Sequence, residues 1–555
     1  MSKISEKLKF LKSKFFIFIY FVILAIILCS PASLYPRSLI IGYNDAWQFV
    51  WNFWWFKTAL FNLHTNPFYT TYLHFPDGIS LLFHTVNLAN TIPAIIFQYI
   101  FGEVQTYNLL VIFNLALTGF AVYLLGLYLT KNKFAGFIAG LIVAFSSYMV
   151  VHAWGHLNLI SFGWPVLFIL FYLKMTKKDG NWKLPTIFLI ITGLTDWYYF
   201  FFVILFVSLH LIYSLIAQRR IFEQQFIKNI IITLLLSLMV LSPYLGTMIY
   251  LKITNPDFNV PGHDPLINSV DLMAFFVPNH TSIWHDLFSD YWERWRLSWE
   301  GVGFIGYSVL ALCLFSLIAL AKKNKEVIFW GISAFLFFIL ALGPFLQING
   351  LIYRNITLPY SWLEKCFPLI TFSGVPARFA VMMYLSLAML AALAISSILE
   401  ERKLWKIIIL GLIVIILGVE LLPTRVKYTE IGVPEFYQTM AKDKEYYVVM
   451  DVSTKESKVL FYQTIHQKKL IAGYTSRPTN KTMAFLAETP VISNIYHSLD
   501  FSEPVDAAAD RETLKNYQIK YIIIGYRDKV RLNILQELEL PIVFQRGKII
   551  VFRVY

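Results

Sequence analysis

Residues 41–60 have the sequence Ile-Gly-Tyr-Asn-Asp-Ala-Trp-Gln-Phe-Val-Trp-Asn-Phe-Trp-Trp-Phe-Lys-Thr-Ala-Leu. Trp47, Trp51, Trp54 and Trp55 recur at nearly helical spacing after one carboxylate, Asp45. The pattern predicts a helix that lies flat at the bilayer surface, where indole rings prefer to sit. An acid held there would suit an enzyme whose substrate is a soluble group carried on a lipid. The alternative is an interfacial anchor with Asp45 as a solvated helix cap.

The composition excludes a soluble globular protein. Of the 555 residues, 57% are hydrophobic and 15% are charged, whereas soluble domains have about 25% charged residues. The mean hydropathy is +0.59. The formal charge of +13 comes mostly from short Lys and Arg clusters between apolar runs, which indicates membrane topology rather than nucleic-acid binding. The three cysteines are far apart, so we expect neither a disulfide framework nor a thiolate metal site.

Apolar runs separated by basic clusters predict about eleven transmembrane helices. The first run lacks a small-residue cleavage site, so we expect it to be retained. Lysines before this run place the N-terminus in the cytoplasm and the Asp45 loop outside. The basic clusters stay on one side only if the run 86–101, interrupted by Pro93, lies at or dips into the outer surface. The expected crossings are residues 15–34, 109–129, 134–151, 157–173, 184–195, 197–217, 229–250, 302–321, 327–348, 379–399 and 404–422.

Residues 1–422 therefore form the predicted membrane domain, with extracytoplasmic loops at 35–108 and 251–300. Residues 423–555 have the composition of a soluble domain, in which strand-like and helix-like runs alternate. This predicts a small extracytoplasmic α/β domain. Its expected strands are residues 446–452, 520–525 and 542–555, the last with a Gln-Arg-Gly-Lys hairpin turn, and its expected helices are residues 435–442, 456–467 and 511–517.

Polar residues in apolar surroundings fall on the outer face under this topology. They are Asp45, His84, His152, His156, Asp196, Asp271, Glu300 and Arg378. The cytoplasmic side has only short basic turns, and the sequence has no Gly-rich phosphate loop of the P-loop kind. We therefore expect an active site at the outer face whose activated donor arrives in the membrane.

Transfer of a group from a lipid phosphate requires a base for the acceptor's proton and a cation for the departing phosphate. Asp45 suits the first role. Arg378 suits the second because a guanidinium binds phosphate oxygens in bidentate geometry, although it could instead be an interfacial anchor. Asp196 follows a short span and either faces a watery cavity or caps the next helix.

His152 and His156 are four residues apart and could bind a metal from one helix face. No third ligand follows in the same stretch, so a phosphate or sugar contact from His156, or an interfacial hydrogen bond, is the stronger expectation, and a divalent metal stays open. His84 and His152 complete the candidate substrate-binding set. In that set, Asp196, Asp271 and Glu300 are expected to orient the acceptor sugar.

Short segments along most of the chain resemble the C-type glycosyltransferases (GT-C), which use polyprenyl-phosphate sugars, and more narrowly a bacterial and archaeal group of that superfamily. The resemblance implies an inverting transfer with Asp45 as catalytic base and with Arg378 and His156 near the donor phosphate. Many members carry two adjacent acids in the first loop, whereas here Asn44 precedes Asp45, which weakens the expectation of metal dependence. The matching segments are Asn44-Asp45, 51–55, 82–85, 155–158, 196–199, 269–272, 376–379 and 473–478.

The sequence therefore predicts a glycosyltransferase of the cytoplasmic membrane. It would transfer a sugar from a polyprenyl-phosphate donor to an acceptor glycan, lipid or protein at the outer face, with no nucleic-acid partner. A transporter or flippase of lipid-linked saccharide would have inverted repeats and midplane polar residues, and neither is evident. A non-catalytic envelope-assembly protein, the third possibility, would tolerate the loss of Asp45.

Overall fold

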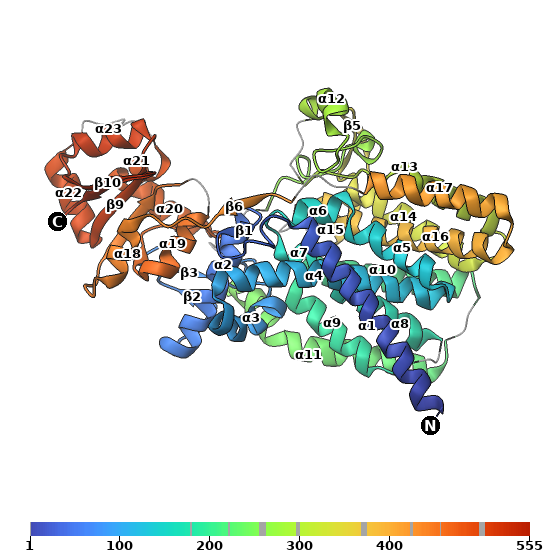
Figure 1. The fold of residues 1–555 in the computed structure, drawn as a ribbon. Helices are drawn as coiled ribbons and strands as arrows, with labels where there is room; N and C mark the ends of the chain where they lie inside the picture. The colour runs from blue at the N-terminus through green and yellow to red at the C-terminus, as the bar shows by residue number, and fades with distance from the viewer. Residues whose placement is uncertain are drawn as a thin grey trace. The chain divides into compact units, whose positions relative to one another are not determined.

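The computed structural model describes residues 2–177, 180–219, 222–254, 262–295, 300–367, 374–421, 426–454, 457–498 and 506–555. The chain forms two compact units (Figure 1), one of residues 1–35, 108–241 and 262–428 and the other of residues 36–107, 242–261 and 429–555. The expected boundary at 422 and 423, parts of the expected outer loop (255–261 and 296–299) and the expected helix start at 456 lie outside the described residues.

The chain is an integral membrane protein built mainly of apolar helices. Within the described ranges, five helical segments are long and apolar enough to cross a membrane: α4 (Glu103–Thr130), Leu157–Thr176 with α7 (Leu157–Ile160) and α8 (Gly163–Thr176), α10 (Trp197–Ile216), α11 (Gln224–Thr254), and Pro376–Glu401 with α16 (Ala380–Glu401). Shorter apolar helices are Lys14–Leu28 of α1 (Ser2–Leu28), α3 (Leu88–Phe101), α5 (Lys133–Ala144), α9 (Lys183–Thr195) and α13 (Tyr307–Phe315) with η4 (Ser316–Leu320). The polytopic helical class is thus confirmed, while the number and orientation of crossings stay predictions.

Three expected spans end early. In the first two, α1 stops at Leu28 where the span was expected to reach residue 34, and α5 stops at Ala144 where it was expected to reach residue 151. In the third, the sequence predicts a helix over residues 327–348, but α14 (Lys325–Ala341) stops at Ala341 and β4 (Phe345–Ile348) follows. Gly343, with a φ of +79°, and Pro344 separate the two because the first adopts a left-handed backbone and the second lacks the N–H that a helix needs. β4 then pairs antiparallel with β5 (Leu351–Thr357), before α15 (Pro359–Cys366).

The segment Pro376–Glu401, which has Arg378 near its start, is buried inside the first unit. Helix α16 is buried throughout its apolar length and packs against α5, α13 and α14, whereas α17 (Leu404–Glu420) is mostly exposed. Arg378 lies in η6 (Pro376–Phe379), the turn that starts α16, and is 8% exposed. Its guanidinium is therefore held inside the protein and does not extend from it as an interfacial anchor would.

The second unit contains a five-stranded mixed sheet, of which Figure 1 labels β9 and β10. The order of its strands is β10-β11-β9-β7-β8. The central strand β7 (Val448–Val452) is parallel to β8 (Lys469–Leu470) and β9 (Ile519–Gly525). The hairpin β10 (Ile542–Arg546) and β11 (Ile549–Arg553) adds antiparallel strands, and its two-residue turn is the one expected from Gln-Arg-Gly-Lys. The helices of this region are α18 (Glu435–Lys442), α19 (Lys458–His466), α20 (Asn480–Glu488), α21 (Pro490–His497), α22 (Ala507–Asn516) and α23 (Lys529–Glu537).

Alternate side chains of the sheet form the core of this α/β region. Val448 and Met450 of β7 share a buried cluster with Ile522 of β9 and Phe552 of β11, against residues of α21, α22 and α23. The period of two is what a strand imposes on one face of a sheet. The expected C-terminal α/β fold is confirmed; α20, α21, α23 and β8 were not predicted.

The aromatic helix α2 (Asp45–Lys57) forms as expected, but its indoles do not lie on a surface. Trp47, Trp51, Trp54 and Trp55 are at most 3% exposed. Trp47 stacks on Phe461 of α19 with ring centroids 4.9 Å apart, and Trp51 Nε1 donates a hydrogen bond of 2.7 Å to Gln463 Oε1. The partner of this face lies 412 residues further along the chain, so local spacing could not indicate it.

Helix α3 buries polar side chains and exposes apolar ones, which is the opposite of an amphipathic helix in a soluble protein. It buries Asn90, Thr91 and Gln98, whereas Ile96 and Ile100 are exposed. An apolar face turned outward fits the expectation that residues 86–101 lie against lipid. Shorter elements of the chain are β1 (Leu39–Ile41), η1 (Thr58–Asn62), β2 (Tyr69–Thr70), β3 (Ile79–Ser80), α6 (Ser147–His152), η2 (Leu272–Phe275), η3 (His285–Phe288), α12 (Ser289–Arg294) and β6 (Tyr428–Glu430).

Candidate functional site

The first polar centre surrounds Asp45 in the second unit. Asp45 is the first residue of α2 and is half-buried. The Tyr474 hydroxyl donates a hydrogen bond of 2.8 Å to its Oδ1. Burial, together with the neighbouring Asp45 charge, raises the pKa of Tyr474, so the phenol keeps its proton and acts as a donor. The Ser457 hydroxyl bonds to the carbonyl of Asn44, which fixes the residue before the acid.

His84 holds the segment that carries Tyr474. Its Nε2 lies 3.0 Å from Asn52 Oδ1, and the backbone N–H of Ser476 donates to its Nδ1 at 3.2 Å. Because a backbone N–H only donates, Nδ1 is unprotonated and Nε2 carries the hydrogen. Burial lowers the pKa of His84 to about 4, although the Asp45 charge opposes this. Both ring nitrogens therefore bond within the protein, and the expected substrate contact of His84 stays a prediction.

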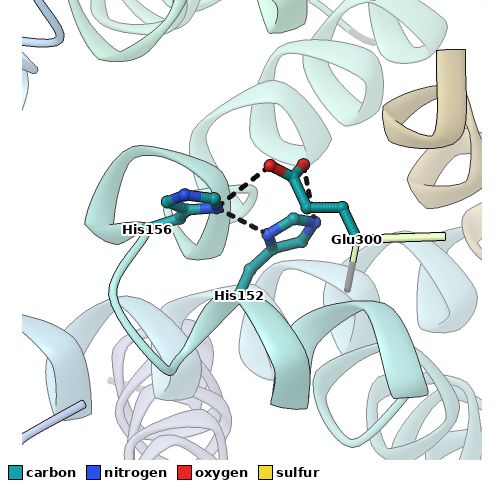
Figure 2. A group of neighbouring side chains, drawn as sticks. All are labelled: His152, His156 and Glu300. Carbon is teal, nitrogen blue, oxygen red and sulfur yellow. Dashed lines mark hydrogen bonds and ion pairs between the residues drawn. The ribbon is translucent and has the colours of Figure 1, made fainter. Parts of the chain in front are cut away.

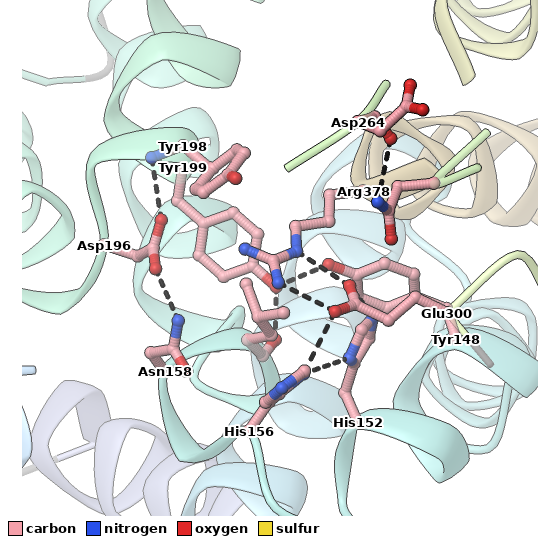
Figure 3. Close-up of polar contacts among 12 residues, drawn as sticks. Tyr148, His152, His156, Asn158, Asp196, Tyr198, Tyr199, Asp264, Glu300 and Arg378 are labelled. Atoms are coloured by element: carbon pink, nitrogen blue, oxygen red, sulfur yellow. Dashed lines mark hydrogen bonds and ion pairs between the residues drawn. The ribbon is translucent and has the colours of Figure 1, made fainter. Parts of the chain in front are cut away.

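The second polar centre is an ion pair between Glu300 and Arg378 in the first unit (Figure 3). The guanidinium donates from Nε to Oε2 at 2.8 Å and from Nη2 to Oε1 at 2.9 Å, and it lies 4.7 Å from the ring centroid of Tyr198. Both charged side chains are buried. Burial would raise the pKa of Glu300, but Arg378 and the two nearby histidines lower it below its usual range, so the carboxylate is ionised.

His152 and His156 flank the same carboxylate (Figure 2). Their Nδ1 atoms are 2.9 Å apart. Glu300 Oε2 lies 3.9 Å from His152 Nε2, and Glu300 Oε1 lies 3.9 Å from His156 Nδ1. Burial lowers the pKa of His152 well below its usual value, so its imidazole is neutral, which is the form that binds metals.

These three side chains fit a divalent cation. One ligand atom from each of His152, His156 and Glu300 lies within 4.8 Å of the others. Two imidazole nitrogens with one carboxylate oxygen form a donor set that zinc and similar ions favour. The sequence offered the two histidines but no third ligand, because Glu300 comes from a distant part of the chain and meets them only in the fold.

Asp196 caps helix α10, as one of the two interpretations of the sequence predicted. Its Oδ1 accepts a hydrogen bond of 2.7 Å from the backbone N–H of Tyr198. Asn158 Nδ2 donates to its Oδ2 at 2.5 Å, and Figure 3 shows both contacts beside Arg378. The carboxylate is also close enough to Arg378 for an electrostatic interaction. Asp196 thus borders the Glu300 centre while it holds the start of α10.

Asp271 is fully buried and bonds to backbone groups. It accepts from Met273 N at 2.8 Å as the cap of η2. It also accepts from Asn349 N at 3.0 Å and from Gly350 N at 2.9 Å, at the turn between β4 and β5. These bonds anchor the hairpin, and the expected contact of Asp271 with an acceptor sugar stays a prediction.

The structure therefore brings four of the eight candidates together, His152, His156, Glu300 and Arg378, with Asp196 beside them. Asp45 and His84 belong to the other unit. Tyrosines at this centre were given no role by the sequence: the Tyr148 ring lies 4.2 Å from that of His152, and its hydroxyl is 3.4 Å from that of Tyr199. Tyr198 and Tyr199 do occur in a segment that matched the GT-C proteins, which is the signal that could have found them.

Comparison with known proteins places the chain in one family and in one fold. A family model described as "Domain of unknown function (DUF6311)" matches residues 18–421, more than half of the chain. Curated protein sequences gave no significant match. Among solved structures, the chain is similar to arabinofuranosyltransferase AftD from Mycobacteria, with 12% identity and a TM-score of 0.59 over 97% of this chain and 40% of that one.

Two further structures are similar. The apo oligosaccharyltransferase of Archaeoglobus fulgidus matches with 12% identity and a TM-score of 0.51, over 92% of this chain and 69% of that one. ArnT from Cupriavidus metallidurans, bound to undecaprenyl phosphate, matches with 10% identity over 97% of this chain and 98% of that one, with a TM-score of 0.45. The fold likeness rests on the first two. It confirms the expected GT-C-like fold, and the chain spans two fifths of the length of AftD.

Proposed function

We propose that this chain, which belongs to the DUF6311 family, is a membrane glycosyltransferase that transfers a sugar from a polyprenyl-phosphate donor to an acceptor glycan, lipid or protein. The observation that carries the proposal is the buried guanidinium of Arg378 at the start of the central apolar helix, in a fold shared with two sugar-transferring enzymes. A buried cation beside apolar helices fits an anionic headgroup on a long apolar tail.

Arg378 is the proposed phosphate ligand. A guanidinium offers several N–H donors in a fixed plane and keeps its charge in a low dielectric, so it can stabilise the negative charge of a departing phosphate. The Tyr198 ring lies against the Arg378 guanidinium and restricts its orientation. His156 is proposed to contact the same phosphate or the donor sugar.

Asp45 is the proposed catalytic base. It takes the proton of an acceptor hydroxyl, whose oxygen forms a bond to the anomeric carbon of the donor sugar. The bond from that carbon to the phosphate oxygen breaks, and the electron pair leaves with the lipid phosphate. The Tyr474 hydroxyl donates to Oδ1 of Asp45 and orients the carboxylate for this proton transfer. Asp196, Asp271 and His84 stay proposed contacts to the acceptor sugar or donor.

A divalent metal is compatible with this chemistry. His152, His156 and Glu300 would hold it, and when bound it would supply positive charge that stabilises a leaving phosphate. We place the reaction at the outer face of the cytoplasmic membrane, with the N-terminus in the cytoplasm and the C-terminal α/β region outside, because basic residues flank the apolar runs on the opposite side.

A transfer assay tests the proposal. The purified chain in liposomes is incubated with a panel of radiolabelled polyprenyl-phosphate sugars and membrane acceptors. Wild type should transfer label, Asp45→Asn should not, and the matched control Asp77→Asn, an exposed acid of the same loop, should keep wild-type rates. Equal transfer by Asp45→Asn would remove Asp45 as the base. No transfer from any donor would favour a transport or assembly role.

A further inference from the structure

Glu300 lies between the guanidinium of Arg378 and the two imidazole rings of His152 and His156. Both of its oxygens accept from Arg378, at 2.8 and 2.9 Å. The same two oxygens face His152 and His156 at 3.9 Å (Figure 2). A bidentate guanidinium occupies one lone pair on each oxygen of a carboxylate. A metal cation that binds through a remaining lone pair therefore competes with Arg378 for the single negative charge of Glu300.

A cation held by the two histidines would draw Glu300 toward them. Ligand atoms that each lie about 2.0–2.2 Å from a tetrahedral zinc are about 3.3–3.6 Å from one another, whereas the Glu300 oxygens are now 3.9 Å from the nearest histidine nitrogens. The histidines must also give up their mutual contact of 2.9 Å. Glu300 therefore moves toward the histidines as the cation binds, and its bonds to Arg378 weaken.

The balance of charge then favours the entry of an anion. Glu300 and Arg378 together are neutral, and the surrounding site is buried. A divalent cation adds two positive charges beside a guanidinium whose pairing with Glu300 is weakened, which is costly in a low dielectric. An anion that takes the place of Glu300 on Arg378 offsets this cost, and a phosphate matches the donor geometry of the guanidinium.

We propose that a zinc-type divalent cation and a phosphate group bind to this cluster as a coupled pair, exchanged through Glu300. The cation binds His152, His156 and Glu300, and Arg378 is thereby released to bind the phosphate. Each ligand strengthens the binding of the other, because linkage is reciprocal. The identification of the phosphate with a lipid-linked sugar donor rests on the proposed function, whereas the coupling itself does not.

The donor set indicates which cation to use. Magnesium and calcium prefer all-oxygen sites, whereas two imidazoles favour zinc, cobalt and their neighbours. Cobalt has visible absorption bands that report on its coordination, so it is the probe, and zinc is measured by its displacement of cobalt.

The test is the affinity of the purified full chain for Co²⁺ in nanodiscs, with and without a phosphate. One arm adds undecaprenyl phosphate to the disc, and the other adds soluble inorganic phosphate below the limit of precipitation, so that the two phosphate sources are distinguished. We expect the phosphate compound that binds Arg378, whether undecaprenyl phosphate or inorganic phosphate, to tighten Co²⁺ binding by about 5- to 150-fold. Absence of Co²⁺ binding, or equal affinity with and without both phosphates, would overturn the proposal.

Variants distinguish the proposed exchange of partners at Glu300 from a purely structural role of the Glu300 and Arg378 ion pair. Arg378→Met should tighten Co²⁺ binding without phosphate, because the competitor for Glu300 is gone, and should abolish the coupling. Glu300→Gln should weaken Co²⁺ binding and also abolish the coupling. The control His210→Gln changes a buried histidine that contacts Tyr172 instead and should behave as wild type. Weaker Co²⁺ binding in folded Arg378→Met would contradict the exchange.

The comparison of the Co²⁺ affinity of wild type with and without phosphate does not depend on the folding of any variant. It also does not depend on sugar transfer. Coupled binding without any transferase activity would therefore retain the inference while the proposed function failed. Transfer activity with uncoupled binding would retain the function and overturn the inference.

Discussion

The phenol of Tyr474 donates a hydrogen bond of 2.8 Å to the carboxylate of Asp45, across a sequence separation of 429 residues. The C-terminal α/β region thus contacts the acid that opens the aromatic helix. Ser476, two residues on, bonds to His84 and to Thr85 of the first loop. The segment 473–478 is therefore joined to the first loop at both the acid and the histidine.

Tyr474→Phe should lower the rate of sugar transfer about tenfold or more. A hydrogen bond to a charged group contributes about 1.5–3 kcal/mol, and here it orients the proposed base. Loss of the donor also raises the pKa of a carboxylate, so the acid limb of the kcat profile should move to higher pH. His84 and Arg477 are the other titratable or charged groups with electrostatic effects at this pair.

The control for this prediction is Tyr526→Phe, which changes an exposed tyrosine of the same α/β region. It should leave both the rate and the pH profile unchanged. If Tyr474→Phe also leaves both unchanged, Tyr474 does not position Asp45, whatever the stability of the variant.

Acid should destabilise the contact between the first loop and segment 473–478. Burial lowers the pKa of His84 from 6.5 to about 4. The folded state therefore binds fewer protons than the unfolded state, and the stability contributed by neutral His84 is present above pH 6.5 and is lost as the pH falls to about 4. The shift corresponds to about 3 kcal/mol.

Hydrogen exchange of residues 473–478 between pH 7 and 4, corrected for intrinsic rates, measures this loss. The exchange protection of wild type should fall with pH more steeply than that of His84→Gln, which cannot titrate there. His74 is also buried with its pKa lowered to about 4, so His74→Gln serves as the matched comparison. Equal slopes for wild type and His84→Gln would show that His84 is not the titrating group.

Substitutions of Glu300 and Arg378 should have strongly non-additive effects on the stability of the protein to unfolding. Removal of one partner from a buried pair typically costs about 3–5 kcal/mol, because the other charge is left unpaired. Replacement of both partners by uncharged residues should cost much less. A double-mutant cycle of Glu300→Gln, Arg378→Met and the double variant, followed by thermal unfolding in detergent, measures the coupling; additive effects would argue against the ion pair.

Arg378→Lys separates the phosphate role from charge alone. Lysine keeps the positive charge but lacks the planar set of donors. We expect the KM for a polyprenyl-phosphate sugar to rise about tenfold or more while the protein stays folded. An unchanged KM would remove Arg378 from the donor site. Arg294→Lys, a change at the exposed last residue of α12, which packs on Tyr291, is the control.

Reporter fusions test the membrane orientation. Alkaline phosphatase requires disulfides, which form outside the cytoplasm. A fusion after Lys177 or Lys322 should be inactive, and one after Tyr555 should be active. Activity after Lys322 together with inactivity after Lys177 would show that an odd number of crossings separates them, and the proposed outer-face site would then be misplaced.

Sequence patterns predicted most of the helices because apolar runs and basic clusters are local signals. Residues 184–195, for example, were expected as a short arm before Asp196, and α9 ends at Thr195. Contacts made in space were not predictable in the same way. Glu300 joined His152 and His156 from a distant loop, and the bonds of Asp271 to the backbone of a hairpin turn could not be foreseen from its place in the sequence.

The tryptophans illustrate the same limit in physical terms. Indole spacing around Trp51 predicted a helix correctly, but amphipathic rings suit both a bilayer interface and a polar-lined protein core. The outcome was decided by Gln463, whose Oε1 accepts from Trp51 Nε1 while its amide donates to the Tyr72 carbonyl. No local feature of residues 41–60 identifies that partner.

The distance along the chain between Trp51 and Gln463 also determines how long after Trp51 its hydrogen-bond partner is synthesised. The 412 residues that separate them take about 20–80 s to translate at roughly 5–20 residues per second. For most of that interval the indole face of α2 is outside the ribosome while α19 has not yet been synthesised. Because the bilayer interface attracts indoles, we expect this face to lie at the interface until α19 replaces it.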